Sequence, residues 1–187
     1  MHLILKYSSL LITISFFTMS SINAQEVRVI DNKGTITTFL KPTIAELYDT
    51  AGGFEITSTG VILEFDTANT ATEITDTDYY AYSNTAITIK KPGTYKVTYR
   101  VTAEPTSGNS RSGTEYMLLK NSNIVDGSYS AAYHRIVNRG KNTASASRIL
   151  VLEKDDKLTV RGNRYAGNST VKTVAHGSSF LVERMIK

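Results

Sequence analysis

The sequence predicts an all-β domain, a sandwich or a barrel, and three observations indicate this class. Apolar and aromatic residues alternate with polar ones over short stretches, of which Thr94 to Val101 is the clearest. Polar stretches rich in Thr, Asn, Ser and Gly separate these segments. Apolar residues nowhere hold a helical period over three turns, so the pattern disfavours an α-helical fold.

The amino-terminal residues have the pattern of a secretory signal. Lys6 is followed by an apolar run from Leu10 to Phe17 and then by small residues up to Ala24, the expected cleavage position. A membrane anchor is the alternative, but the run is shorter than the roughly 20 residues that a bilayer span needs. We therefore expect a secreted or cell-surface protein with no membrane span after cleavage.

The chain is thus expected to have three parts. Residues 1–24 form the signal peptide, residues 25–43 a short lead, and residues 44–187 a single domain. The chain has no cysteine, so no disulfide stabilises this domain after export. Burial of apolar surface, including burial between subunits, is expected to supply the stability.

The strands are expected in this order. Ala86 to Ile89 precedes a Pro92-Gly93 turn and is predicted to pair as a hairpin with the strand that starts at Thr94. Ile149 to Leu152 is apolar on both faces, which predicts cover on both sides, by the opposite sheet and by a neighbouring subunit or loop. Ser178 to Ile186 is predicted to be a final central strand. After a turn at Lys154–Lys157, alternation resumes from Leu158 to Arg161. Weaker strands are predicted at Ala45–Tyr48, Val61–Phe65, Glu115–Lys120 and Ser128–Tyr133.

Charge is distributed unevenly along the chain. Residues 25–90 contain 4 basic and 10 acidic residues, whereas residues 91–187 contain 16 basic and 7 acidic residues. Either the two halves face each other, within the domain or between subunits, or the basic half forms a surface for a polyanion. Nothing in the pattern indicates a nucleic-acid partner.

The central strands contain a characteristic order of residues: Tyr80, Ile87, Gly93, Tyr95, Val97 and Tyr99. Their spacing resembles the aromatic signature of the complement C1q and tumour-necrosis-factor-like jelly-roll superfamily, with Ile87 and Val97 where the family has phenylalanine. Segments around Leu150, Leu152 and Phe180 are similar to later family strands. The resemblance identifies a divergent, bacterial-type member.

This resemblance implies a ten-stranded jelly roll of two antiparallel sheets that assembles into a homotrimer. The family is generally a ligand-binding or receptor-binding head without catalytic residues. The signature positions Tyr80, Ile87, Gly93, Tyr95, Val97, Tyr99, Leu150, Leu152 and Phe180 are then expected in the core or at the oligomer interface.

A ligand site is expected among basic and aromatic residues of the carboxyl-terminal half. Charge and ring stacking would recognise an anionic or sugar ligand, and solubility or pairing between subunits is the alternative role. The candidate residues are Arg135, Arg139, Lys141, Arg161, Arg164, Tyr133 and Tyr165.

One predicted turn is a candidate calcium site. Asp155 and Asp156, with Glu153, have the carboxylates that calcium prefers, and a solvated turn is the other interpretation. Asp76 and Asp78 form a second such pair. No other cofactor is expected, and the two histidines after the signal, His134 and His176, are expected at a surface or interface.

Three functions remain open at this point. The first is a trimeric binding or adhesion module that recognises a glycan, a polyanion or a protein. The second is a structural coat or surface component without a discrete ligand. The third is a carbohydrate-active enzyme, which would need two carboxylates across a cleft. The pattern favours binding over catalysis, because no nucleophile elbow or histidine metal motif is present.

Overall fold

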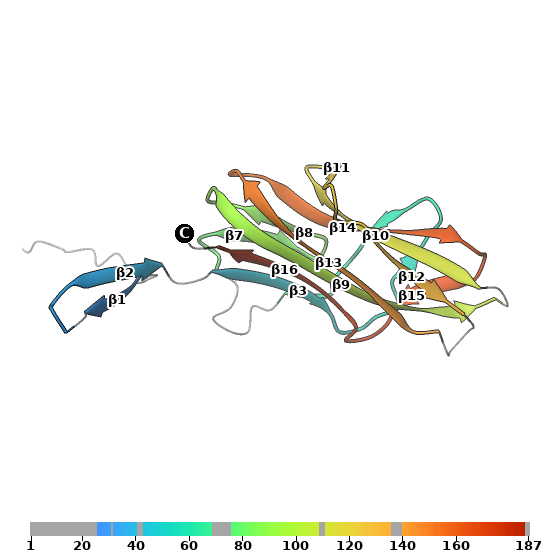
Figure 1. Ribbon diagram of the computed structural model, residues 1–187. Coiled ribbons are helices and arrows are strands. Elements are labelled where there is room, and N and C mark those ends of the chain that lie inside the picture. Colours follow the sequence, from blue (N-terminus) through green and yellow to red (C-terminus); the bar gives the residue numbers. More distant parts are fainter. Residues whose placement is uncertain are drawn as a thin grey trace, which may run out of the picture. The chain divides into compact units, whose positions relative to one another are not determined.

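The computed structural model describes residues 26–30, 32–40, 43–68, 76–108, 111–135 and 140–185 of the chain. These residues form sixteen β-strands and no helix, so none of them belongs to a membrane-spanning helix (Figure 1). The expected signal peptide lies outside the described residues. The expected lead contains β1 (Glu26–Ile30) and β2 (Ile36–Leu40), which pair as a sheet of their own.

A second compact unit, Leu40–Lys187, contains two seven-stranded antiparallel sheets. The first sheet is here called the β9 sheet. Its longest strand, β9 (Gly93–Ser107), has fifteen residues. Because of this length, β9 pairs with one strand along one edge and with two successive strands along the other. Its strands are β3 (Ile44–Asp49), β4 (Glu55–Ile56), β6 (Thr67–Ala68), β9 (Gly93–Ser107), β13 (Asn142–Leu152), β15 (Thr170–Thr173) and β16 (Ser178–Arg184).

The alternation of the sequence explains why β9 is the central strand. Tyr95, Val97 and Tyr99 point to the buried side, and polar residues between them point outward. β13 runs antiparallel along one edge of β9, whereas β16 lies between β9 and β3 on the other edge. The prediction that the carboxyl-terminal strand is a central one is therefore confirmed.

The second sheet is here called the β10 sheet. β10 pairs with β14 on one edge and with β11 and β12 on the other, and β14 pairs in turn with β8 and β5. Its strands are β5 (Val61–Ile62), β7 (Tyr80–Ser83), β8 (Ala86–Ile89), β10 (Ser112–Lys120), β11 (Asn123–Ile124), β12 (Ser130–His134) and β14 (Lys157–Ala166).

The structure corrects one predicted pairing. β8 was expected to form a hairpin with β9, but it pairs with β7 and β14 in the β10 sheet. The short segment containing Pro92 carries the chain from one sheet to the other, and the end of β8 bonds the turn before β14, where the Ile89 N–H donates to the Asp156 carbonyl at 2.9 Å. The strand expected at Val61 also ends earlier, at Ile62, although Phe65 remains buried.

Aromatic rings fill the core between the sheets. Tyr80 packs edge to face against Tyr95, and Phe65 stacks on Phe180, each with ring centroids 6.0 Å apart. The buried Tyr80 hydroxyl finds a backbone acceptor, since it donates to the Thr43 carbonyl at 2.8 Å. Of the signature positions, Gly93 is half-buried and Leu150 partly buried, whereas the buried ones are Tyr80, Ile87, Tyr95, Val97, Tyr99, Leu152 and Phe180.

Candidate functional site

The outward face of the β9 sheet carries exposed apolar side chains on β13. Ile149 is 60% exposed and Val151 is 69% exposed, while Leu150 and Leu152 between them point into the sandwich. Apolar side chains of this run therefore point to both faces of the strand, as its sequence predicts. The opposite sheet covers the inward side, and no described part of this chain buries Ile149 or Val151.

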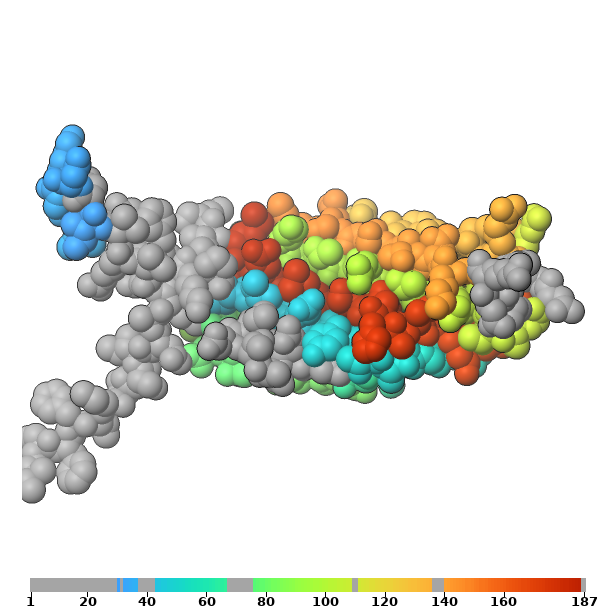
Figure 2. Space-filling view, turned by 90° about the horizontal axis from the view of Figure 1, so that it is seen from below, coloured from blue at the N-terminus to red at the C-terminus, as the bar shows by residue number. Residues whose placement is uncertain are grey.

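The row of side chains that contains Ile149 crosses the sheet and is interrupted by charged residues. Ile149 lies opposite Lys96, which lies opposite Glu183 and then Ile44, so two apolar residues flank a charged pair in one row. Met185, which is 40% exposed, follows β16 directly. Figure 2 shows β13 (orange), β9 (green), β16 (red) and β3 (cyan) side by side on this face.

β13 is also an edge strand in the described structure. It pairs with β9 along one side and with no strand along the other. An exposed edge combined with exposed apolar residues is a feature that proteins normally cover. This face is therefore suited to contact with another protein surface.

Three exposed tyrosines gather on the outward face of the β10 sheet, and we call them the tyrosine surface. Their exposed fractions are 57% for Tyr129, 47% for Tyr133 and 51% for Tyr165. Two of them, Tyr133 and Tyr165, were predicted as ligand contacts. Tyr129 was not among the predicted ligand contacts; it lies in the predicted strand Ser128–Tyr133, whereas in the structure it stands just before β12.

Gly113 provides the space in which the Tyr165 ring lies. It is the cross-strand partner of Tyr133, and the Tyr165 ring covers it so closely that an added Cβ would lie 2.4 Å from Tyr165 Cζ. The glycine thus gives the Tyr165 ring a flat place on the sheet, beside Tyr133. Any larger residue at this position would displace the ring.

A carboxylate lies at the centre of the tyrosine surface. Glu115 accepts a hydrogen bond from the Tyr129 hydroxyl at 3.0 Å through Oε2 and one from Asn163 Nδ2 at 2.8 Å through Oε1. The bond to the carboxylate raises the pKa of Tyr129, because it stabilises the protonated phenol. Exposed rings around fixed polar groups can stack on a ligand and orient it.

The structure does not bring the predicted basic residues together. Arg161 donates to the Thr59 carbonyl at 3.2 Å, and Arg164, on the opposite side of β14, donates to the Ser169 carbonyl at 2.5 Å. Arg135 is exposed after β12, and Lys141 lies 3.9 Å from Glu104, a residue of the β9 sheet. Arg139 lies outside the described residues. The two tyrosines of the candidate set share a surface, whereas Arg161 and Arg164 bind backbone carbonyl groups.

His134 was expected at a surface or interface, and this expectation is wrong. The side chain is fully buried at the end of β12, where Nδ1 bonds the Gly140 carbonyl at 2.8 Å. A carbonyl can only accept, so Nδ1 carries the proton and Nε2 accepts from the Thr114 hydroxyl at 2.9 Å. Burial lowers the pKa of His134 and keeps the ring neutral. His176 is exposed.

The candidate calcium residues lie in the turn between β13 and β14. Asp156 is buried and not solvated, and its carboxylate binds Lys120 Nζ at 2.8 Å, Asn121 Nδ2 at 2.6 Å and the Glu153 backbone N–H at 2.8 Å. Burial opposes ionisation, but these donors outweigh it and lower the pKa of Asp156. Asp155 is exposed. Among the described residues, no group of three or more His, Cys, Asp or Glu side chains is arranged to hold a metal ion.

Comparison with known proteins identifies the fold. No protein-family model and no curated protein matches the sequence. Among solved structures, a crystal structure of murine APRIL at pH 8.0 has a TM-score of 0.53 and 11% sequence identity over 78% of this chain and 100% of that chain. The structure of Eiger TNF from S. frugiperda has a TM-score of 0.52 and 12% identity over 77% of this chain and 92% of that chain. The predicted tumour-necrosis-factor-like jelly roll is therefore confirmed.

Proposed function

We propose that this tumour-necrosis-factor-like jelly roll is a secreted or cell-surface homotrimeric binding module and not an enzyme. The observation that carries the proposal is the exposed apolar strip of Ile149 and Val151 on the outward face of the β9 sheet. Three copies related by a closed rotation axis would cover this strip and the free edge of β13 together. The absence of cysteine fits this arrangement, because subunit contacts would supply stability that disulfides cannot.

Substitution of Ile149 by glutamate tests the assembly. A buried isoleucine contributes about 1.5–3 kcal/mol relative to an exposed one, and a buried unpaired carboxylate adds a larger penalty. We expect the purified native chain to have the mass of a trimer in light scattering and I149E to have that of a monomer. Ile124 of β11 is 59% exposed, so I124E is a matched control that should remain trimeric. A native chain that is monomeric over a wide concentration range would refute the proposal.

We further propose that the tyrosine surface binds a carbohydrate. Aromatic rings stack on the apolar face of a sugar ring, and the Glu115 carboxylate with the Asn163 amide would bond its hydroxyl groups. A polyanion is a poorer match, because the central group is itself an anion. This distinguishes the proposal from a basic surface for sulfated or phosphorylated glycans.

A glycan array followed by titration calorimetry with the best neutral glycan tests this surface. Y165A and Y133A should each weaken binding about tenfold or more, since aromatic anchors of this kind carry about 1.4 kcal/mol or more. Y82A is the control, because Tyr82 of β7 is also partly exposed, at 38%. Equal losses for all three variants, or binding to sulfated glycans alone, would contradict the proposed site.

A further inference from the structure

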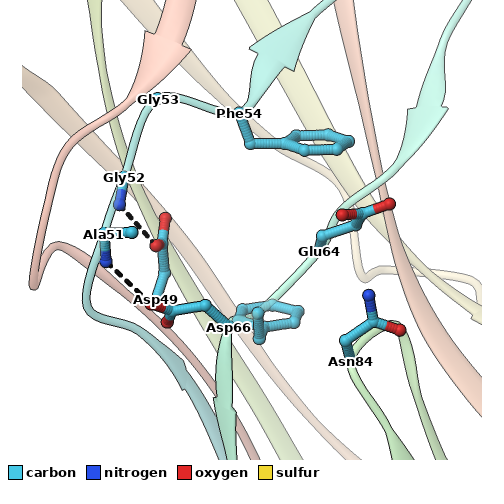
Figure 3. A pocket seen from close by; sticks show the side chains of 9 residues that line it. Asp49, Ala51, Gly52, Gly53, Phe54, Glu64, Asp66 and Asn84 are labelled. Carbon is cyan, nitrogen blue, oxygen red and sulfur yellow. Dashed lines mark hydrogen bonds between the residues drawn. The ribbon is translucent and has the colours of Figure 1, made fainter.

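A pocket of about 370 Å³ lies beside the end of β3 (Figure 3). Backbone from Ala51 to Gly53 forms part of its wall. The described residues that line it include no lysine, arginine or histidine, and its described side chains are Asp49, Phe54, Glu64, Phe65, Asp66 and Asn84. The pocket is therefore acidic with aromatic walls, and its volume is in the range of small-ligand sites.

Asp49 is the unusual residue of this pocket. Its side chain is 97% buried, having 3% exposure, and its Oδ1 accepts a hydrogen bond from the Gly52 backbone N–H at 2.7 Å. The other oxygen, Oδ2, is shielded from water and has no hydrogen-bond partner in the described structure. A buried carboxylate oxygen without a donor is rare, because nothing replaces the water bonds it has lost. Such an oxygen on the wall of a pocket indicates a missing donor.

Asp66 holds the adjoining turn in shape. Its carboxylate accepts hydrogen bonds from the Thr50 hydroxyl and from the backbone N–H groups of Thr50 and Ala51, at 2.5 Å and 2.9 Å for the two N–H groups. Gly52 follows with a φ of +66°, where an added Cβ would lie 2.3 Å from the Ala175 backbone nitrogen. The turn is thus packed from both sides, and the pocket wall is built before any ligand arrives.

The carboxylates lie on opposite walls. Figure 3 shows Asp49 and Asp66 on one side and Glu64 with Asn84 on the other. They do not converge as the ligands of a metal ion would, and the described residues contain no group of three or more acidic or histidine side chains suited to a metal. An organic cation has several donors spread over its surface, so it can reach both walls. The Phe54 ring adds an aromatic face that attracts a cation.

We propose that this pocket binds a guanidinium or alkylammonium group. Asp49 Oδ2 and the Glu64 carboxylate would accept its hydrogen bonds, and Asp66 would keep the turn in place. The group could belong to a free small molecule or to an arginine or lysine side chain of a peptide. This site is separate from the tyrosine surface, so the failure of either proposal would leave the other intact.

Titration calorimetry of the full mature chain at low ionic strength provides the test, with agmatine, cadaverine, a blocked Gly-Arg-Gly peptide and calcium chloride as probes. We expect agmatine or the peptide to bind, and the stronger of the two identifies the source of the cation. D49N should weaken binding about tenfold or more, because it replaces the free acceptor with a donor and removes a charge. The asparagine oxygen can still accept from Gly52, so the variant should fold.

Controls separate this site from a general effect of acidic charge. E64Q should also weaken binding, whereas D126N, which removes an exposed carboxylate from the turn after β11, should not. The ligand that binds should raise the melting temperature of the native chain and not that of D49N. Binding of calcium alone, no binding of any organic cation, or equal affinity of D49N and the native chain would overturn the proposal.

Discussion

Removal of the Tyr99 hydroxyl tests whether the core holds the tyrosine surface in place. Tyr99 extends from β9 across the sandwich, and its hydroxyl lies 2.5 Å from the Ser128 carbonyl, 2.9 Å from Ser130 Oγ and 2.9 Å from the Tyr116 carbonyl. Ser128 and Ser130 flank Tyr129, so this buried hydroxyl fixes the backbone that carries an exposed ring. In Y99F the ring remains and these hydrogen bonds are lost.

The stability that Y99F should lose follows from the burial of this hydroxyl group. Tyr99 and Ser128 are both buried, so no water can replace the lost donor, and an unsatisfied buried acceptor costs about 1–3 kcal/mol. For a domain of this size that corresponds to a fall of roughly 2–12 °C in the melting temperature. Urea unfolding of native and variant chains at neutral pH measures the free energy directly.

Tyr116 offers a matched control in the same core. Its hydroxyl is also buried, and no hydrogen bond of normal geometry reaches it, although the Thr114 side chain lies near enough to influence its pKa. Y116F deletes the same atom without breaking a good hydrogen bond, so its stability should be equal to or above that of the native chain. Equal destabilisation by Y99F and Y116F would refute the reasoning. Y99F should also weaken glycan binding at the tyrosine surface, and Y116F should not.

Three further predictions concern single features of the fold. Burial lowers the pKa of His134 below its unfolded value of about 6.5. The free energy of unfolding should therefore be at its full value above that pH and fall as the pH drops below it, by up to about 1.4 kcal/mol per pH unit. A free energy of unfolding that stays constant between pH 7.5 and about 5 would contradict this. The donors on Asp156 occupy its carboxylate, so the melting temperature should be the same with EDTA and with millimolar calcium. D156A should lose about 1–3 kcal/mol, because it removes hydrogen bonds to a buried carboxylate, while Lys120, whose side chain is 35% exposed, can be hydrated instead. G113A should displace the Tyr165 ring and weaken glycan binding as much as Y165A does, and unchanged affinity in titration would show that the ring is not part of the site.

The long strands were predictable because their alternation is set by the chain itself. Tyr95, Val97 and Tyr99 alternate with polar residues, and this period of two is typical of a strand with one buried face. Several such stretches in succession predict an all-β fold. The pairing of Ala86–Ile89 was not predictable in this way. A turn between two strands fixes their proximity along the chain, but it does not decide whether the second strand joins the same sheet or crosses to the other.

The binding residues were harder to assign, because their strands continue beyond the segments in which apolar and polar residues alternate. The strand after Leu158 was expected to end at Arg161 but continues to Ala166, so Arg161 and Arg164, three positions apart, fall on opposite faces. His134 is buried for a similar reason, since β12 extends one residue past its predicted end and places 130, 132 and 134 on the inward side. Glu115 was missed because a single acidic residue in a strand gives no sign of its cross-strand partners.

The acidic and basic halves of the sequence are both spread over the two sheets of the fold. Each half supplies strands to both sheets, and two ion pairs among the described residues, Lys120–Asp156 and Lys141–Glu104, each join two residues of the basic half. Asp49 and Glu64 belong to the acidic half, and neither makes an ion pair with a described residue. The described residues that line the pocket include no lysine, arginine or histidine that could pair with them. A bound cation would supply that partner, so a ligand of that charge should stabilise the fold as well as occupy the site.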